Sequence, residues 1–241
     1  WLYYSILRVY QLTGKPAFRW VRLTGMGLDE KGEAMHKSKG NVIDPDPYVE
    51  KYGADAFRFW AAAAGKLGSD YRFSEQVLKT GSLFATKLWN IGRFISAFPE
   101  PQSEPKLKPI DLMILEELNR VIEDCDRGYS ELDVYEPINR IYQFVWNIFA
   151  SHYIEAVKRR AYNKDGKYST EEQEAAWYTL HKVFKTSLKL LAPIMPYITD
   201  YIWRKMYSSR SIHLEEFPKP NEAWNRGYGK LLTPFIEVNS A

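Results

Sequence analysis

A short polar segment near the start of the chain carries the residues best suited to chemistry. It runs from Ala34 to Asn41 and reads Ala-Met-His-Lys-Ser-Lys-Gly-Asn. The two lysines supply compact positive charge, the hydroxyl of Ser38 can donate a hydrogen bond, and Gly40 lets the backbone come close to a ligand. This combination suits the negative charge that builds up on a phosphoryl group during transfer. By composition alone, the same residues would also fill an ordinary solvated turn.

The segments before this lysine loop predict the closing part of an α/β nucleotide-binding domain. Residues 1–12 have apolar residues at helical spacing and are followed by Thr-Gly-Lys-Pro, so we expect a helix that ends there. Apolar and basic residues alternate with a period of two over residues 18–23, which predicts a strand. Residues 29–33 are typical of an exposed turn. The expected order is therefore helix, strand, turn and lysine loop.

The loop and the residues after it resemble the second ATP signature of class I aminoacyl-tRNA synthetases. The resemblance includes residues 42–45 (Val-Ile-Asp-Pro) and residues 52–59 (Tyr-Gly-Ala-Asp-Ala-Phe-Arg-Phe). Within the family it is similar to the branched-aliphatic group of valyl, isoleucyl and leucyl enzymes. The family loop reads Lys-Met-Ser-Lys-Ser, whereas here Ala34 stands in place of the first lysine and His36 in place of the first serine.

This resemblance implies that the loop binds ATP, together with Mg²⁺, and that Lys37 carries the catalytic charge. The residues implied to contact ATP are Met35, His36, Lys37, Ser38, Gly40 and Asn41. Trp1 aligns with a tryptophan that walls the amino-acid pocket in valyl and isoleucyl members. A flat indole face suits a branched aliphatic side chain, although Trp1 could also be a core residue.

From Ser74 onward the whole chain has helical periodicity. Before Ser74, a helix is expected to start at Asp46-Pro47 with Asp46 as its cap, and another covers 54–64 after Gly53. Further helices are expected to begin at Ser74, near Asp111, at Asp133 and at Ser169 or Thr170, and a short last helix covers 197–207. The third of these further helices is expected to face inward with Ile138, Ile141, Tyr142, Val145, Trp146, Phe149 and Tyr153. Proline-rich residues 99–109 have the composition of a linker. Short connections between helices favour an up-and-down antiparallel bundle, so the expected fold is mainly α with an α/β (Rossmann-like) beginning.

The second half resembles the helical anticodon-binding bundle of the same family. The matching runs are residues 87–94, 144–147, 153–158 and 191–199. Isoleucyl relatives usually carry Arg-Asp-Arg-x-Trp where this chain has Lys-Arg-Arg-Ala-Tyr at residues 158–162. The valyl members are therefore the closer match.

Two groups of residues could contact tRNA. Specific RNA recognition targets unstacked bases, which pack on aromatic rings and guanidinium planes, and Arg93 and Phe94 supply one of each beside Lys87. The resemblance implies that Phe94 stacks on anticodon bases, with a core position as the alternative. A second, basic group at the end of a predicted helix could contact phosphates or merely complement the helix dipole; it consists of Lys158, Arg159 and Arg160.

The composition is that of an ordinary globular protein. Of the 241 residues, 45% are hydrophobic and 26% are charged, and the formal net charge of +3 is too small to indicate nucleic-acid binding by itself. The single cysteine, Cys125, excludes an internal disulfide framework, and its spacing from apolar neighbours predicts a core thiol. Because no apolar run reaches membrane-span length and no signal peptide opens the chain, we expect a cytoplasmic protein without a membrane partner. The start at Trp1, in mid-pattern, suggests a piece of a longer protein.

We therefore expect the end of a catalytic domain over 1–73, a joining helix and linker over 74–107, an anticodon-binding bundle over 108–217 and a tail over 218–241. The resemblance implies a parent enzyme that ligates valine to a valine-accepting tRNA with ATP. The alternatives are an isoleucyl or leucyl enzyme, a stand-alone tRNA-binding module and a helical scaffold with a decorative loop. The family's first ATP signature, His-x-Gly-His, does not occur around any of the four histidines, so this chain alone is predicted to be inactive.

Overall fold

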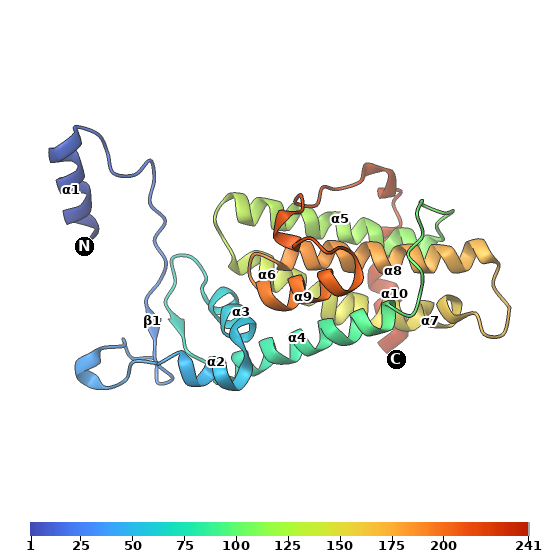
Figure 1. The fold of residues 1–241 in the computed structure, drawn as a ribbon, viewed down its shortest axis with the longest axis horizontal. Coiled ribbons are helices and arrows are strands. Elements are labelled where there is room, and N and C mark those ends of the chain that lie inside the picture. The colour runs from blue at the N-terminus through green and yellow to red at the C-terminus, as the bar shows by residue number, and fades with distance from the viewer. Residues whose placement is uncertain (241) are drawn as a thin grey trace.

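The computed structural model describes residues 1–240 and is mainly helical, as predicted (Figure 1). The first part contains α1 (Leu2–Thr13), β1 (Gly27–Leu28), α2 (Asp46–Tyr52), α3 (Ala54–Ala64) and β2 (Tyr71–Arg72). The second part contains α4 (Glu75–Ile95), α5 (Pro109–Ser130), α6 (Tyr135–Tyr142), α7 (Ile154–Tyr162), α8 (Thr170–Leu191), α9 (Pro196–Met206) and α10 (Leu232–Ser240). In Figure 1 the helices from α4 onward pack together at one side, while α1 lies apart from them at the other.

The strand predicted over residues 18–23 is wrong, whereas the helix before it is confirmed. Helix α1 ends at Gly14, which has a left-handed backbone with φ of 66° and donates its N–H to the carbonyl of Tyr10. Residues 18–23 are irregular, and the sheet consists of β1 and β2, paired in parallel with Gly27 opposite Tyr71. An alternating pattern makes a strand only where a neighbouring backbone completes the ladder, and within residues 1–240 no strand pairs with residues 18–23.

Helices α2 and α3 form a small core with β2 and the start of α4. The predicted helix start at Asp46 is one residue off, because Pro45 takes the cap position and Asp46 is the first helical residue. Gly53 separates the two helices with φ of 88°, a conformation that glycine adopts without strain. Trp60, Phe73 and Leu78 form the buried centre of this small core.

The main hydrophobic core lies among α4, α5, α6, α7, α8 and α9. The predicted caps of two of these helices are confirmed. Ser74 Oγ accepts a hydrogen bond from the backbone N–H of Val77 (3.4 Å) at the start of α4. At the start of α8, Glu172 N–H donates to Ser169 Oγ (3.2 Å) and Ser169 N–H donates to Glu172 Oε2 (2.9 Å), which completes a capping box.

The third long helix runs without a break from Tyr135 to Tyr162, but its middle is a π-helix, Gln143–Tyr153. In a π-helix the backbone bonds join residues five apart instead of four. Consistent with this spacing, the Ser151 hydroxyl donates to the Trp146 carbonyl, five residues earlier (2.8 Å). The wider turn also buries Phe144 completely, a residue that the α-helical pattern does not place inside.

The predicted linker and tail both lie on the main core. The carboxylate oxygen Oε2 of Glu104, in the linker, accepts hydrogen bonds from the Tyr178 hydroxyl and the Trp224 indole, each at 2.9 Å. The indole of Trp224 is only 2% exposed. These two segments therefore complete the hydrophobic core instead of extending into solvent.

Cys125 is a core thiol, as predicted. It is fully buried on α5, and burial raises the pKa of its thiol to about 12. Within residues 1–240, no helix combines the length and the apolar character needed to cross a bilayer.

Candidate functional site

The lysine loop follows β1 and is held in place by two polar side chains. The buried carboxylate of Asp29 accepts hydrogen bonds from the backbone N–H groups of Lys31 (2.9 Å) and Glu33 (2.8 Å). The Asn41 amide donates to Asp29 Oδ2 (2.9 Å), and its oxygen accepts from the His36 N–H (2.9 Å). The Glu33 N–H and the Asn41 amide hold the pKa of Asp29 below its ordinary value. Asp29 and Asn41 therefore fix both ends of the loop.

Only one of the two loop lysines is free. Residues Lys37–Lys39 form a single 3₁₀ turn that ends at Gly40, where φ is 66° and a left-handed backbone favours glycine. Lys39 lies 3.7 Å from the carboxylate of Glu33. Lys37 is exposed, and no side chain of residues 1–240 pairs with its ammonium. The turn thus presents one unpaired cation at its tip.

The other residues predicted to contact ATP fall into two groups. Met35 and Asn41 hold the loop itself, because Met35 Sδ accepts from the Ile43 N–H (3.4 Å) and Asn41 spans the loop. His36 and Ser38 are exposed beside Lys37. A free ammonium, a hydroxyl and a left-handed glycine fit a phosphate group. The contacts with ATP stay predictions.

No group of three or more His, Cys, Asp or Glu side chains in the described part of the chain is arranged to hold a metal ion. The expectation of Mg²⁺ therefore rests on the resemblance alone.

Trp1 does not form the wall of a pocket in this structure. Its side chain is 90% exposed, and none of the residues of α1 is buried. Both the pocket position and the core position that the sequence left open need neighbours that residues 2–240 do not supply. The predicted contact of Trp1 with an amino acid stays a prediction.

The structure brings the two predicted tRNA-binding groups close together through a residue to which the sequence analysis gave no role. Phe94 is half-buried on α4, and its ring lies 6.0 Å from the ring of Tyr162 at the end of α7. Tyr162 also lines a cavity of about 420 Å³ together with Lys158 and Arg159. Arg93 is exposed beside Phe94. An aromatic ring, a guanidinium and a basic cavity thus share one surface, which we call the α4–α7 surface (Arg93, Phe94, Lys158, Arg159 and Tyr162).

Two cations of this surface, Lys158 and Arg159, are paired with exposed carboxylates. Lys158 lies 3.3 Å from Glu155, and Arg159 lies 2.6 Å from Asp165, which raises the pKa of the guanidinium. Such exposed pairs contribute little to stability, so a phosphate can replace the carboxylate at small cost. Lys164 adds a further cation, 5.4 Å from the centre of the Tyr162 ring.

Arg160 is a correction to the predicted phosphate contacts. Its side chain is 8% exposed, and its guanidinium forms a bidentate ion pair with the fully buried Asp111, one bond measuring 2.9 Å. The Tyr153 hydroxyl donates to the same carboxylate (2.6 Å). In the sequence, the three cations Lys158, Arg159 and Arg160 look equivalent. The helix directs the side chain of Arg160 inward, where its charge pairs with Asp111.

Lys87 also lies away from the basic cavity. Its ammonium is 5.4 Å from the centre of the Trp146 ring, on the π-helical segment. Cation and ring attract each other at this distance, so Lys87 has a partner within the fold. Its contact with tRNA stays a prediction.

Comparison with known families identifies both parts of the chain. The family model described as the anticodon-binding domain of tRNA ligase matches residues 111–240, more than half of the chain. The chain belongs to this family. The model for class I tRNA synthetases (I, L, M and V) matches residues 1–74, which include the lysine loop.

Individual anticodon-binding tRNA ligases are similar over almost the whole chain. The valine–tRNA ligase of Aeropyrum pernix is 60% identical over 222 residues, which make up 91% of this chain and 27% of that protein. The valine–tRNA ligase of Pyrobaculum aerophilum is 57% identical over 241 residues, 100% of this chain and 30% of that protein. The chain thus spans less than a third of the length of these curated relatives.

A solved tRNA ligase supports the fold. The LeuRS of Agrobacterium radiobacter K84, in a ternary complex with tRNA and LeuAMS, matches with a TM-score of 0.68. The match covers 92% of this chain and 27% of that chain, at 19% sequence identity. The arrangement of helices is therefore shared with a class I synthetase although the sequences have diverged.

Proposed function

We propose that this chain is the part of a valine–tRNA ligase that carries the second ATP signature loop and the anticodon-binding domain. The observation that carries the proposal is the lysine loop, which presents the unpaired Lys37 ammonium on a turn fixed by Asp29 and Asn41. The similarity to two valine–tRNA ligases supports valine as the amino acid. The partners proposed are valine, ATP with its Mg²⁺, and a valine-accepting tRNA.

Lys37 would act on the pyrophosphate that leaves when a carboxylate oxygen of valine attacks the α-phosphorus of ATP. The adenylyl group of ATP then becomes bonded to valine, and the bond between the α-phosphorus and the oxygen bridging to the β-phosphate breaks. The Lys37 ammonium is exposed and has no ion pair within residues 1–240, so its contact with the charge that grows on the departing oxygens would break none. Ser38 would donate its hydroxyl to the same oxygens, and His36 would replace the serine of the usual loop. Met35 and Asn41 would contribute by holding the loop in shape.

The α4–α7 surface is the proposed site for the anticodon. The exposed edge of Phe94 and the ring of Tyr162 would stack on unpaired bases, and Arg93 would lie against a base plane. Lys158 and Arg159 would exchange their exposed carboxylate partners for phosphates.

We propose the division of the chain into a catalytic part over 1–73, a joining segment over 74–107, an antiparallel bundle over 108–217 and a final segment over 218–241. The two family matches support the first two boundaries, because one ends at residue 74 and the other begins at residue 111. Large exposed apolar side chains occur in the first segment, as expected for a surface that further parts of a longer ligase cover; they include Trp1, Tyr10, Leu12, Trp20 and Leu23.

Aminoacylation by the full-length protein tests the proposal. The protein is incubated with ATP, total tRNA and either valine, isoleucine or leucine, and charged tRNA is measured. We expect charging with valine at the highest kcat/KM. A preference for isoleucine or leucine would move the chain to another member of the group, and tRNA binding without charging would favour a stand-alone binding module.

The 241-residue chain by itself should catalyse no ATP–pyrophosphate exchange, because it lacks the His-x-Gly-His signature. Exchange above background with valine, in a preparation free of host synthetase, would contradict this expectation.

A further inference from the structure

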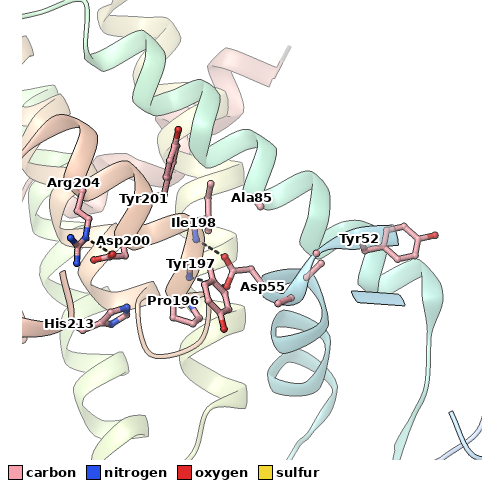
Figure 2. Close-up of a pocket in the computed structure, with 13 residues that line it drawn as sticks. Tyr52, Asp55, Ala85, Pro196, Tyr197, Ile198, Asp200, Tyr201, Arg204 and His213 are labelled. Atoms are coloured by element: carbon pink, nitrogen blue, oxygen red, sulfur yellow. Dashed lines mark hydrogen bonds and ion pairs between the residues drawn. The ribbon is translucent and has the colours of Figure 1, made fainter. Parts of the chain in front are cut away.

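Helix α3 binds the ends of two helices of the main core through two charged side chains. Asp55 and Arg58 lie three residues apart, on one face of α3. The Asp55 carboxylate accepts hydrogen bonds from the backbone N–H groups of Tyr197 (3.2 Å) and Ile198 (2.6 Å), at the start of α9. Figure 2 shows these bonds as dashed lines between Asp55 and the first turn of α9. We call Asp55 and Arg58 the α3 clamp.

The other half of the α3 clamp grips the segment just after α8. Arg58 Nε donates to the carbonyl of Ile194 (2.8 Å), and its Nη2 donates to the carbonyl of Pro193 (2.9 Å). Helix ends leave unpaired N–H groups at the start and unpaired carbonyls at the end. The carboxylate therefore meets the positive end of α9 and the guanidinium meets carbonyls beyond the negative end of α8, each with the favourable sign.

The start of α9 depends on Asp55 because it has no cap of its own. The residue at the cap position is Met195, and no side chain of its own segment bonds the first-turn N–H groups. Asp55 is only 8% exposed, and burial raises its pKa while the two N–H groups of α9 oppose that rise. A distant helix thus supplies a cap that the local sequence lacks.

Helix α3 is also shared by the two hydrophobic cores. Phe59 packs into the main core, with ring centres 5.9 Å from Phe84 and 5.7 Å from Tyr142. Trp60, the next residue, belongs to the small core that includes Phe73. Because α3 follows α2 and the lysine loop in the chain, its direction determines where the loop lies relative to the main core.

An open groove of about 840 Å³ lies beside the α3 clamp, between α3, α4 and α9. Ala56, in its wall, is 1% exposed and packs closely against Gly81 of α4. Toward α9, the hydrogen bonds of Asp55 and Arg58 hold α3 to the main core.

We propose that Asp55 and Arg58 are positioning residues that keep the lysine loop in register with tRNA held on the main core. The inference rests on the proposed function, and it adds residues that touch neither ATP nor tRNA. It also explains why two runs that carry the family resemblance, residues 52–59 and 191–199, contact each other across 136 to 142 positions of the chain. Loss of the α3 clamp should leave the lysine-loop region and the main core folded, with ATP and tRNA still bound. It should slow the charging of tRNA, which needs both parts.

The first arm of the test measures the contact itself by amide hydrogen exchange in the full-length protein. In Asp55→Ala, the N–H groups of Tyr197 and Ile198 should exchange about tenfold faster or more, with a smaller effect in Asp55→Asn, which keeps one acceptor. Amides in the middle of α8 should be unchanged. The matched control is Asp46→Asn, an exposed carboxylate in the first turn of α2. Unchanged exchange at Tyr197 and Ile198 would overturn the proposal.

The second arm measures catalysis with Asp55→Asn and with Arg58→Lys, which keeps the charge but loses the fork. We expect kcat for charging of tRNA to fall about tenfold, while KM for tRNA and the rate of ATP–pyrophosphate exchange without tRNA stay within about twofold. A raised KM for tRNA with unchanged kcat, or equal loss in both reactions, would overturn a positioning role. If the wild-type protein charges no valine, the proposed function fails. Amide hydrogen exchange at Tyr197 and Ile198 then decides by itself whether the α3 clamp exists.

Discussion

The lysine-loop region and the main core are held together in different ways. Among residues 1–54, Asp29 is the only buried one, and the loop is fixed by hydrogen bonds from Asp29 and Asn41. In α5 and α8, by contrast, the inward side chains are almost all fully buried. Polar contacts define the geometry of the first region and apolar burial stabilises the second. The lysine loop is thus joined to the main core without being part of its apolar packing.

The largest test of this contrast is the loss of a buried charge from the main core. Arg160→Ala leaves the Asp111 carboxylate buried without its partner, so it should lower the free energy of unfolding by about 3–5 kcal/mol. Its neighbour provides the matched control, since Arg159→Ala removes an exposed pair worth about 0.2–1 kcal/mol. Urea unfolding of both variants measures the difference. Equal losses of unfolding free energy in the two variants would mean that the Arg160–Asp111 pair does not stabilise the main core.

The next test concerns the lysine loop, where a change should affect catalysis and leave stability alone. Lys37→Ala in the full-length ligase should lower the rate of valine adenylation on the order of a hundredfold, about 2.7 kcal/mol in the barrier, with a smaller effect on ATP affinity. Lys39→Ala is the control, because Lys39 already has a partner in Glu33. Pre-steady-state adenylation and thermal melting are measured together. An unchanged rate would reduce the loop to a solvated turn.

A third test concerns Phe94, at the proposed anticodon site on the main core. Removing the Phe94 ring should cost about 1–3 kcal/mol of stacking, so Phe94→Ala should weaken binding of the cognate tRNA roughly five- to a hundredfold. A tRNA with a substituted anticodon should bind poorly from the outset and lose little more. Filter binding or fluorescence titration with both tRNAs provides the measurement.

Lys158→Ala is the control for this test, because a lost phosphate contact should weaken both tRNAs alike. The melting temperature must be followed too, since Phe94 is half-buried against Phe98 and Tyr162. A variant that melts far below the wild type and binds tRNA normally would make Phe94 a packing residue only.

The smallest expected effect lies at the rim of the main core and depends on pH. The ammonium of Lys108 and the N–H of Ser169 lower the pKa of Glu172 from 4.5 to about 2. Because the folded-state pKa is the lower one, the stabilisation is present above pH 4.5 and is lost as the pH falls toward 2. Glu172→Gln should therefore flatten the pH dependence of the unfolding midpoint between these values. Glu171→Gln, an exposed neighbour, should follow the wild type; identical curves for all three proteins would contradict the assignment.

The sequence predicts the helices well because a helix completes its hydrogen bonds within its own segment. Ser74 and Ser169 cap the starts of their helices, and Gly14 and Gly53 lie at helix boundaries in the structure as in the prediction. The strand over 18–23 could not be judged from its own alternation, since a strand needs a partner elsewhere in the chain. The phosphate contact predicted for Arg160 is wrong for a related reason, because the burial of Arg160 depends on Asp111, which lies 49 positions earlier.

The candidate site shows the same limit. Lys37 and its exposed neighbours follow from residue type and local order alone. Tyr162, which joins Phe94 to the basic cavity, and the α3 clamp depend on contacts between distant segments. In the sequence, Tyr162 is visible only as an aromatic residue that ends a basic run, and the α3 clamp only as a charged pair three residues apart on a helix. Neither pattern indicates which distant residue is the partner.

The π-helical segment within the third long helix has a consequence for the residues that follow it. Phe144 and Phe149, five residues apart, stack with their rings 10° from parallel and their centres 6.5 Å apart. Because the backbone bonds of this segment join residues five apart, the residues of α7 are displaced around the helix axis relative to a continuous α-helix. Arg160 lies beyond this displacement, so the π-helical segment contributes to directing its guanidinium toward the buried Asp111.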